Sequence, residues 1–175
     1  MPDWFRQWVD AFRRDEDGVT AIEFGLVATP FFVIIIAIIE TSLMFFNATL
    51  LEGAVSDASR AIRTGEVASQ GDPQDAFRET VCDTVLTLPC DELLFEVRAF
   101  DDFGTAATAE PTYDDDGNLV PAGFNTGSGN QVIVARVTHN YQFITPLVGA
   151  VIAGNADSRI PLSAVAIFRN EPFDD

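Results

Sequence analysis

Lysine is absent from this chain of 175 residues, and all ten of its basic residues are arginine. There are 27 acidic residues and a single histidine, so the formal net charge is −17 at pH 7. A chain this acidic repels phosphate backbones, and we therefore expect no nucleic-acid partner. The 15 phenylalanines and the hydrophobic content of 47 % are unlike a disordered acidic chain. The length suits one globular domain with a modest core.

The sequence also lacks the usual catalytic motifs. It contains no Cys-x-x-Cys pair, no Gly-rich phosphate loop and no evident Ser–His–Asp set, and scattered Ser and Asp residues do not make an active site. His139 lies in the middle of a predicted strand, where we interpret it as a half-exposed strand residue. The prediction is that the protein is not an enzyme and uses no cofactor.

Cysteine is scarce, with Cys82 and Cys90 as the two thiols. A structural zinc site needs four ligands, so this pair does not make one alone. One disulfide in an oxidising compartment is the better interpretation. Two free buried thiols are the alternative.

Charged residues are missing from the segment 24–39, FGLVATPFFVIIIAII. Glu40 interrupts the apolar run, which then continues to Leu51. At about 1.5 Å per residue, a helix from Val19 to Leu51 would be roughly 50 Å long, whereas a bilayer core is about 30 Å thick. The helix is therefore expected to cross a membrane over about residues 19–46 and to project beyond it.

Three interpretations of this apolar segment compete. A cleaved secretory signal has a shorter apolar region followed by a small-residue cleavage site, and no convincing site follows here. An ordinary uncleaved signal anchor is the simplest alternative. The third is a prepilin-type signal, in which the cut falls before the apolar helix.

The residues before the helix favour the third interpretation. Residues 13–24 read RRDEDGVTAIEF, so charge stops at Gly18 and returns once, at Glu23. A carboxylate at the centre of a membrane helix costs about 2.5–3.5 kcal/mol and is by default a functional candidate. The alternative is that Glu23 reaches the cytoplasmic headgroups and has no further role.

The stretch that begins at Gly18, GVTAIEFGLVATPFF, combines a glycine, small residues, a Glu-Phe pair, a short apolar stretch and a proline. It resembles TadE-family minor pseudopilins of the Tad/Flp (tight-adherence) type IV pilus system. The Ala- and Ser-rich residues 54–65 and the sequence RNEPF at residues 169–173 extend the resemblance. The middle of the chain contributes nothing specific to it.

The resemblance implies that an inner-membrane prepilin peptidase cuts between Gly18 and Val19 and removes residues 1–18 as a cytoplasmic leader. Glycine suits this position because it lets the backbone extend and approach a protease closely. Glu23 and Phe24 would become the fifth and sixth residues of the processed chain. The Glu23 carboxylate would neutralise the new amine of a neighbouring subunit, since an ion pair in an apolar bundle costs less than an unpaired charge. Both tryptophans lie in the leader, so the processed protein would have none.

Pro30 lies inside the apolar helix, at the position where the related proteins carry their proline. It removes one backbone hydrogen bond, so a kink or local opening is expected. Membrane helices also tolerate proline without a specific mechanism, and that alternative stays open.

Topology follows from the basic residues beside the span. Arg13 and Arg14 lie closest to it on the N-terminal side, while Arg60 and Arg63 follow at a distance. Because basic residues concentrate on the cytoplasmic side, we predict a single-pass protein of the bacterial inner membrane with a cytoplasmic N-terminus. Its C-terminal domain would be periplasmic.

The C-terminal part, residues 66–175, is expected to form a globular α+β domain. Asp72 as N-cap and Pro73 in the first turn predict a helix that ends near Leu86. Alternating apolar residues predict strands. The predicted strands cover residues 93–100, 131–144 and 159–169, with a small hairpin that turns at Asp116-Gly117.

The fold class is therefore predicted to be α+β and pilin-like. A long N-terminal helix at residues 19–65, partly transmembrane, would pack against a small antiparallel sheet beside the short helix. The helix face against the sheet is predicted to consist of Ala54, Ala58, Ala61 and Ile62, whose mostly small side chains permit close approach.

A weak calcium candidate lies in the acidic turn, where Asp114, Asp116 and Asn118 supply hard oxygen ligands at alternate positions. The terminal Glu of an EF-hand loop is missing, and a solvated turn is the preferred interpretation. No metal site is predicted elsewhere.

Together these features predict a structural protein: a minor pseudopilin that takes part in Tad-type pilus assembly and adhesion. Its expected partners are the prepilin peptidase, the inner-membrane assembly platform, other pseudopilins, the major pilin and membrane lipid. The alternative is an uncleaved single-pass protein whose periplasmic domain binds or senses a ligand.

Overall fold

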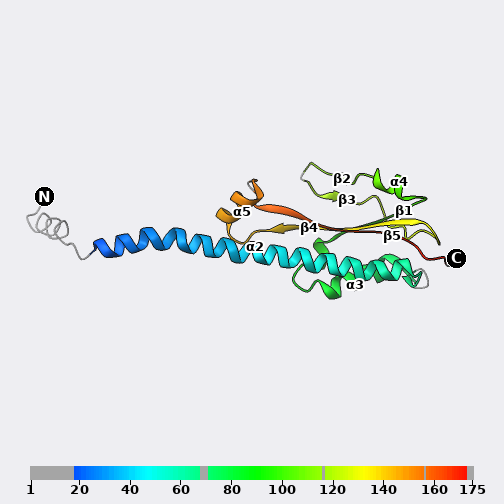
Figure 1. Cartoon of the computed structure of the whole chain (residues 1–175), viewed down its shortest axis with the longest axis horizontal. Coiled ribbons are helices and arrows are strands. Elements are labelled where there is room, and N and C mark those ends of the chain that lie inside the picture. Colours follow the sequence, from blue (N-terminus) through cyan, green and yellow to red (C-terminus); the bar gives the residue numbers. More distant parts are fainter. Residues whose placement is uncertain (1–17, 68–70, 116, 156, 173–175) are drawn as a thin grey trace, which may run out of the picture. The chain divides into compact units, whose positions relative to one another are not determined.

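The computed structural model describes residues 18–67, 71–115, 117–155 and 157–172. The chain forms two compact units, Met1–Ile39 and Glu40–Asp175. Apart from Gly18, the predicted leader lies outside the described residues. The elements confirm the predicted α+β class, with a long N-terminal apolar helix, short helices and a small antiparallel sheet (Figure 1).

Helix α2 spans Val19–Arg63 and continues through Pro30. Its part in the first unit is long and apolar enough to cross a membrane, and no side chain of its most apolar window is buried. Exposed Phe, Leu, Ile and Val side chains cover this part on all sides. A helix that is apolar all round requires an apolar environment, which a bilayer supplies.

The part of α2 in the second unit has a different pattern, because one face of it is buried. The buried residues recur at intervals of three and four, which places them on one helix face. They are Glu40, Met44, Asn47, Leu51, Ala54, Val55, Ala58, Ser59 and Ile62. Of the four residues predicted for this face, Ala54, Ala58 and Ile62 are buried and Ala61 is half-buried. Gly65 ends the helix with a φ of 76°, as expected of a C-terminal glycine.

Helix α3, Pro73–Thr84, begins as predicted. The Asp72 side chain accepts hydrogen bonds from the backbone N–H groups of Gln74 at 2.9 Å and Asp75 at 3.3 Å. The helix buries Phe77 and Val81 in the second unit. Burial of such side chains stabilises a fold by about 1.5–3 kcal/mol each. A one-turn 3₁₀ helix, η2 (Cys90–Glu92), follows.

The sheet has three antiparallel strands in the order β1-β4-β5. Their bounds are Leu94–Phe100 for β1, Val132–Gln142 for β4 and Arg159–Arg169 for β5. Each lies within two residues of its predicted range at either end, because alternation and turn residues mark strands well. The predicted hairpin is also present, as β2 (Thr112–Tyr113) paired with β3 (Leu119–Val120).

The central strand β4 corrects one prediction. His139 was expected to be half-exposed, but only 5 % of it is accessible. Residues 132–139 are all buried, so both faces of β4 are covered. The alternating pattern of an exposed sheet does not apply to such a strand, which explains the error.

Two short helices were not predicted. Helix α4 spans Phe103–Ala107, and the Asp102 side chain caps it by accepting a hydrogen bond from Thr105 N at 2.9 Å. Helix α5 spans Pro146–Ala153, begins after Thr145 and ends at Gly154, which has a left-handed conformation. Five and eight residues are too few to show a helical period, although Pro146 and Gly154 are helix start and stop signals.

Candidate functional site

The predicted processing site lies where helix α2 begins. Val19 is the first residue of α2, and the Gly18 carbonyl accepts a hydrogen bond from Ile22 N at 3.1 Å. Gly18 is exposed, and a Cβ added to it would meet no atom within 4 Å. The backbone φ angle of Gly18 is not positive, unlike that of Gly65. Neither backbone conformation nor close packing in the described structure therefore requires glycine at this position.

The three residues assigned to assembly lie on the same helix in the first unit. Glu23 is exposed, as are Phe24 and Pro30. Among the residues that the structure describes, Glu23 has no hydrogen-bond or ion-pair partner. A carboxylate on an apolar helix face carries a high desolvation cost unless a positive charge pairs with it. The structure thus places the three predicted residues on one helix, where all three are exposed.

Sequence reasoning missed Glu40 as a structural group and treated it as an interruption of the apolar run. In the structure only 3 % of Glu40 is accessible. Its Oε1 accepts hydrogen bonds from the backbone N–H groups of Ile144 and of Thr145, the latter at 2.9 Å. Its Oε2 is buried without a hydrogen-bond partner among the described residues.

The Glu40 carboxylate fixes the start of helix α5. Thr145 is the N-cap residue of α5 and makes no side-chain cap hydrogen bond itself. The first N–H groups of a helix need acceptors, and a negative charge is favourable beside them. The charge also acts on Tyr141, whose pKa is raised by burial and, to a lesser extent, by Glu40. The signal in the sequence was an acid in an apolar run, but its partners lie about a hundred residues away in the chain.

Cys82 and Cys90 form a disulfide, with their Cα atoms 5.6 Å apart. The bond joins α3 to η2, and the Arg78 side chain donates a hydrogen bond to the Cys90 carbonyl at 3.4 Å. This disulfide closes a short loop of the second unit.

The acidic turn is organised by hydrogen bonds within it. The Asp114 carboxylate accepts hydrogen bonds from Asn118 N at 2.7 Å and Asn118 Nδ2 at 2.8 Å. Asp116, the other calcium candidate, lies outside the described residues. Within the described part of the chain, no three His, Cys, Asp or Glu side chains are grouped so that they could hold a metal ion.

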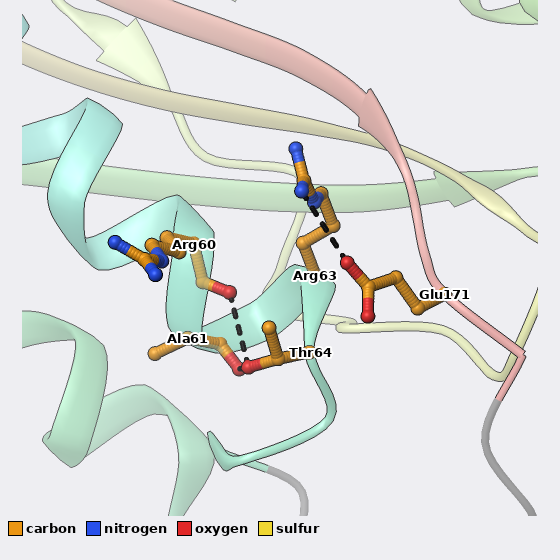
Figure 2. A network of polar contacts seen from close by, with 5 residues as sticks. All are labelled: Arg60, Ala61, Arg63, Thr64 and Glu171. Carbon is orange, nitrogen blue, oxygen red and sulfur yellow. Dashed lines mark hydrogen bonds and ion pairs between the residues drawn. The ribbon is translucent and has the colours of Figure 1, made fainter.

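The C-terminal RNEPF sequence contacts the end of α2. Arg63 Nη2 lies 3.3 Å from Glu171 Oε1 (Figure 2). In addition, Glu171 N donates a hydrogen bond to the Arg63 carbonyl at 2.9 Å. Asn170 is buried, and its Nδ2 donates to the Thr126 and Ser128 carbonyls at 2.9 and 3.1 Å. These contacts give the tail a structural role, whereas Phe173 lies outside the described residues.

Three charged or titratable side chains of the sheet are buried, which the sequence analysis did not predict: those of Glu96, Arg136 and His139. Glu96 Oε2 accepts a hydrogen bond from Arg136 Nη1 at 2.8 Å, and Glu96 Oε1 accepts one from Ala122 N at 3.1 Å. His139 Nδ1 is 4.0 Å from Glu92 Oε2. Burial lowers the pKa of His139, and the nearby Glu92 partly offsets this.

Comparison with known proteins supports the resemblance at the N-terminus. Residues 18–60 match the family described as TadE-like protein. The match begins at Gly18 and confirms the predicted resemblance over that segment. No curated protein and no solved structure matches the chain.

Proposed function

We propose that this protein is a minor pseudopilin of a Tad-type pilus. In this proposal it is a structural protein without catalytic activity, anchored in the bacterial inner membrane by α2. Its N-terminus is cytoplasmic, its C-terminal domain periplasmic, and it takes part in pilus assembly and adhesion. The observation that carries the proposal is the carboxylate of Glu23, which has no partner among the described residues and lies on an exposed apolar helix within a TadE-like segment.

The role of Glu23 follows from electrostatics. An unpaired carboxylate in an apolar environment is costly, and a positive group from a neighbouring chain reduces that cost. Cleavage after Gly18 creates such a group, the amine of Val19. Pairing of Glu23 with the Val19 amine of another subunit favours one axial stagger of packed helices. That stagger would define how this chain joins the major pilin and other pseudopilins.

Processing accounts for a glycine that the described structure does not need. A Cβ at position 18 would meet no atom within 4 Å. A prepilin peptidase must hold the peptide around the cut in an extended form, which glycine adopts readily and presents without side-chain hindrance. The peptidase, the assembly platform and membrane lipid are therefore the partners proposed for the N-terminal segment.

The N-terminus of the protein recovered from membranes tests this proposal. We expect mass spectrometry to find a chain that begins at Val19 and contains no tryptophan. Gly18→Val should leave the leader attached, because a branched side chain obstructs the peptidase. Gly25→Val is the matched control, since Gly25 also has open space around it and lies beyond the cut. An intact leader in the unmodified protein would contradict the proposal and favour the uncleaved ligand-binding alternative.

A further inference from the structure

Helix α5 presents apolar side chains to its surroundings. Ile144 is 80 % exposed and Val151 77 %, and Leu147 and Ile152 are exposed as well. Isolated exposed apolar residues are ordinary, but here they gather within ten consecutive residues. We call residues 144–153 the α5 segment.

The other face of the α5 segment is packed tightly. Val148 and Gly149 are buried, and a Cβ added to Gly149 would lie 2.8 Å from the Cβ of Phe143. The Ser158 side chain also approaches Gly149 closely, and its Oγ lies 3.4 Å from the Pro146 carbonyl, to which it donates. Since the inner face is fixed in this way, the exposed residues cannot turn inward. They therefore form an apolar patch on the surface of the second unit.

Glu40 of α2 holds the start of the α5 segment. Its carboxylate accepts the backbone N–H groups of Ile144 and Thr145, and it is nearly fully buried. Glu40 directly follows Ile39, the last residue of the uncharged apolar segment. The start of the α5 segment is therefore held at Glu40, the first residue of the second unit.

Other exposed apolar residues lie close to Glu40 along α2. Leu43, Phe45 and Phe46 are exposed in the second unit, within two turns of Glu40. The segment also lies in a stretch of the chain that has few charges. In a chain of net charge −17, no acidic residue lies between Gly117 and Ala156, and the α5 segment contains no charge of either sign. A short apolar segment without acidic residues suits the boundary between headgroups and acyl chains.

We propose that the α5 segment lies on the outer leaflet of the membrane that α2 crosses, with Leu147, Val151 and Ile144 inserted among the lipid acyl chains. This inference rests on the proposed single-pass membrane orientation. The lipid contact would give the second unit a defined orientation on the membrane before pilus assembly. Extraction of the subunit would then have to remove two apolar contacts, α2 and the α5 segment.

Quenching of tryptophan fluorescence by brominated lipid tests the inference. A single reporter can be used, because both native tryptophans lie in the leader and can be replaced. The full chain with Trp4→Phe and Trp8→Phe is reconstituted into vesicles of phosphatidylcholine and phosphatidylglycerol. Leu147→Trp then adds one reporter at an exposed position of α5. With lipids brominated near the headgroup end of the acyl chain, we expect this reporter to lose most of its emission.

Two further variants make the outcome specific. Ile167→Trp places the reporter at an exposed apolar residue of β5. Ile167 lines a groove together with Arg60 and Arg63, which lie near the C-terminal end of α2, far along the helix from Glu40. The emission of this reporter should be unaffected by bromine. Phe31→Trp places the reporter near the middle of the apolar part of α2. For this variant the lipids are brominated near the methyl end of the acyl chain, so that quenching reports the membrane span itself.

The quenching pattern of the three reporters distinguishes the possible outcomes. Quenching at positions 31 and 147 but not at 167 supports the inference. Quenching at 31 alone overturns it and leaves the proposed membrane function intact. Absence of quenching at 31 contradicts the membrane function itself and with it the inference. The reporter at position 147 could also stay unquenched and shift its emission to the red when the protein is diluted. That result overturns the inference, because it shows that a second copy of the chain covers α5 and leaves it on dilution.

Discussion

At the scale of single residues, three carboxylates show how environment assigns different roles to one chemical group. Glu23 is exposed on an apolar helix and has no partner among the described residues. Glu40 is buried and accepts backbone N–H groups, while Glu96 is buried beside a guanidinium. A buried charge is tolerated when hydrogen bonds or an opposite charge compensate it. Glu23 therefore differs from the other two in requiring compensation from outside the described chain.

Replacement of Glu23 by valine separates insertion from assembly. We expect the Glu23→Val protein to insert into the membrane normally, because the substitution removes an insertion cost of about 2.5–3.5 kcal/mol or less. We also expect it to make no contribution to pilus assembly. Membrane fractionation and counts of pili on cells are the measurements. Glu52→Val, at another exposed carboxylate of α2, is the control that should retain assembly. Normal piliation with Glu23→Val would remove Glu23 from the assembly mechanism.

His139 makes the stability of the second unit depend on pH. Burial lowers its pKa in the folded state, whereas in the unfolded chain it titrates near its ordinary value of about 6.5. The unfolded state therefore binds more protons as pH falls through about 6.5, and the folded state loses stability there. Urea unfolding at neutral and mildly acidic pH should show this loss. His139→Gln should reduce the pH dependence, and an unchanged dependence in this variant would assign it to other groups.

At the scale of elements, burial divides the continuous helix α2 into two parts. The part before Glu40 has exposed apolar residues on every side, while the part after it buries one face in the second unit. The sheet is held together by its central strand, since β4 pairs with β1 on one side and with β5 on the other. The Glu96–Arg136 ion pair lies between directly opposed residues of β1 and β4.

Loss of one member of this strand pair should be costly. Arg136→Leu would leave the buried Glu96 carboxylate without its counter-charge, and we expect a decrease of about 3–5 kcal/mol in the free energy of unfolding. Denaturant unfolding measures it. Arg63→Leu is the matched control, because the Arg63–Glu171 pair is about half exposed and such pairs contribute about 0–1 kcal/mol. Equal decreases in the free energy of unfolding for the two substitutions would contradict the expectation that burial makes the Glu96–Arg136 pair the more costly one to break.

At the scale of the whole molecule, the two units suit different solvents. The described residues of the first unit contain one charged side chain, that of Glu23, whereas the second unit carries most of the chain's acidic residues. The boundary at Ile39 and Glu40 coincides with the end of the uncharged run. The second unit nevertheless depends on α2, which supplies part of its core.

Two fragments test that dependence. Residues 40–175 should unfold cooperatively, because they retain the buried face of α2 and the Arg63–Glu171 contacts. Residues 66–175, the predicted globular domain, lack Leu51, Ala54, Val55, Ala58 and Ile62, each at most 1 % exposed. We expect this fragment to lack a cooperative thermal transition in circular dichroism. Cooperative unfolding of the 66–175 fragment at the same temperature would show that α2 is dispensable for the core.

Much of the fold could be predicted from local patterns. The strands, the hairpin and the start of α3 followed from alternation, turn residues and the Asp72 cap, which are local physical signals. Helix α5 was missed because eight apolar residues show no period. The role of Glu40 was missed because its partners are adjacent to it only in the folded chain.

The sequence by itself determined the long apolar helix, the lone carboxylate at Glu23 and the glycine before Val19, because hydropathy and charge act along the chain without any folding. Only the tertiary structure decided which charges are compensated and which apolar residues stay exposed. It buried Glu40 against the start of α5, paired Glu96 with Arg136 and covered both faces of β4. The physical reason is that burial and pairing depend on residues distant in sequence, and their energies are set when these residues come together.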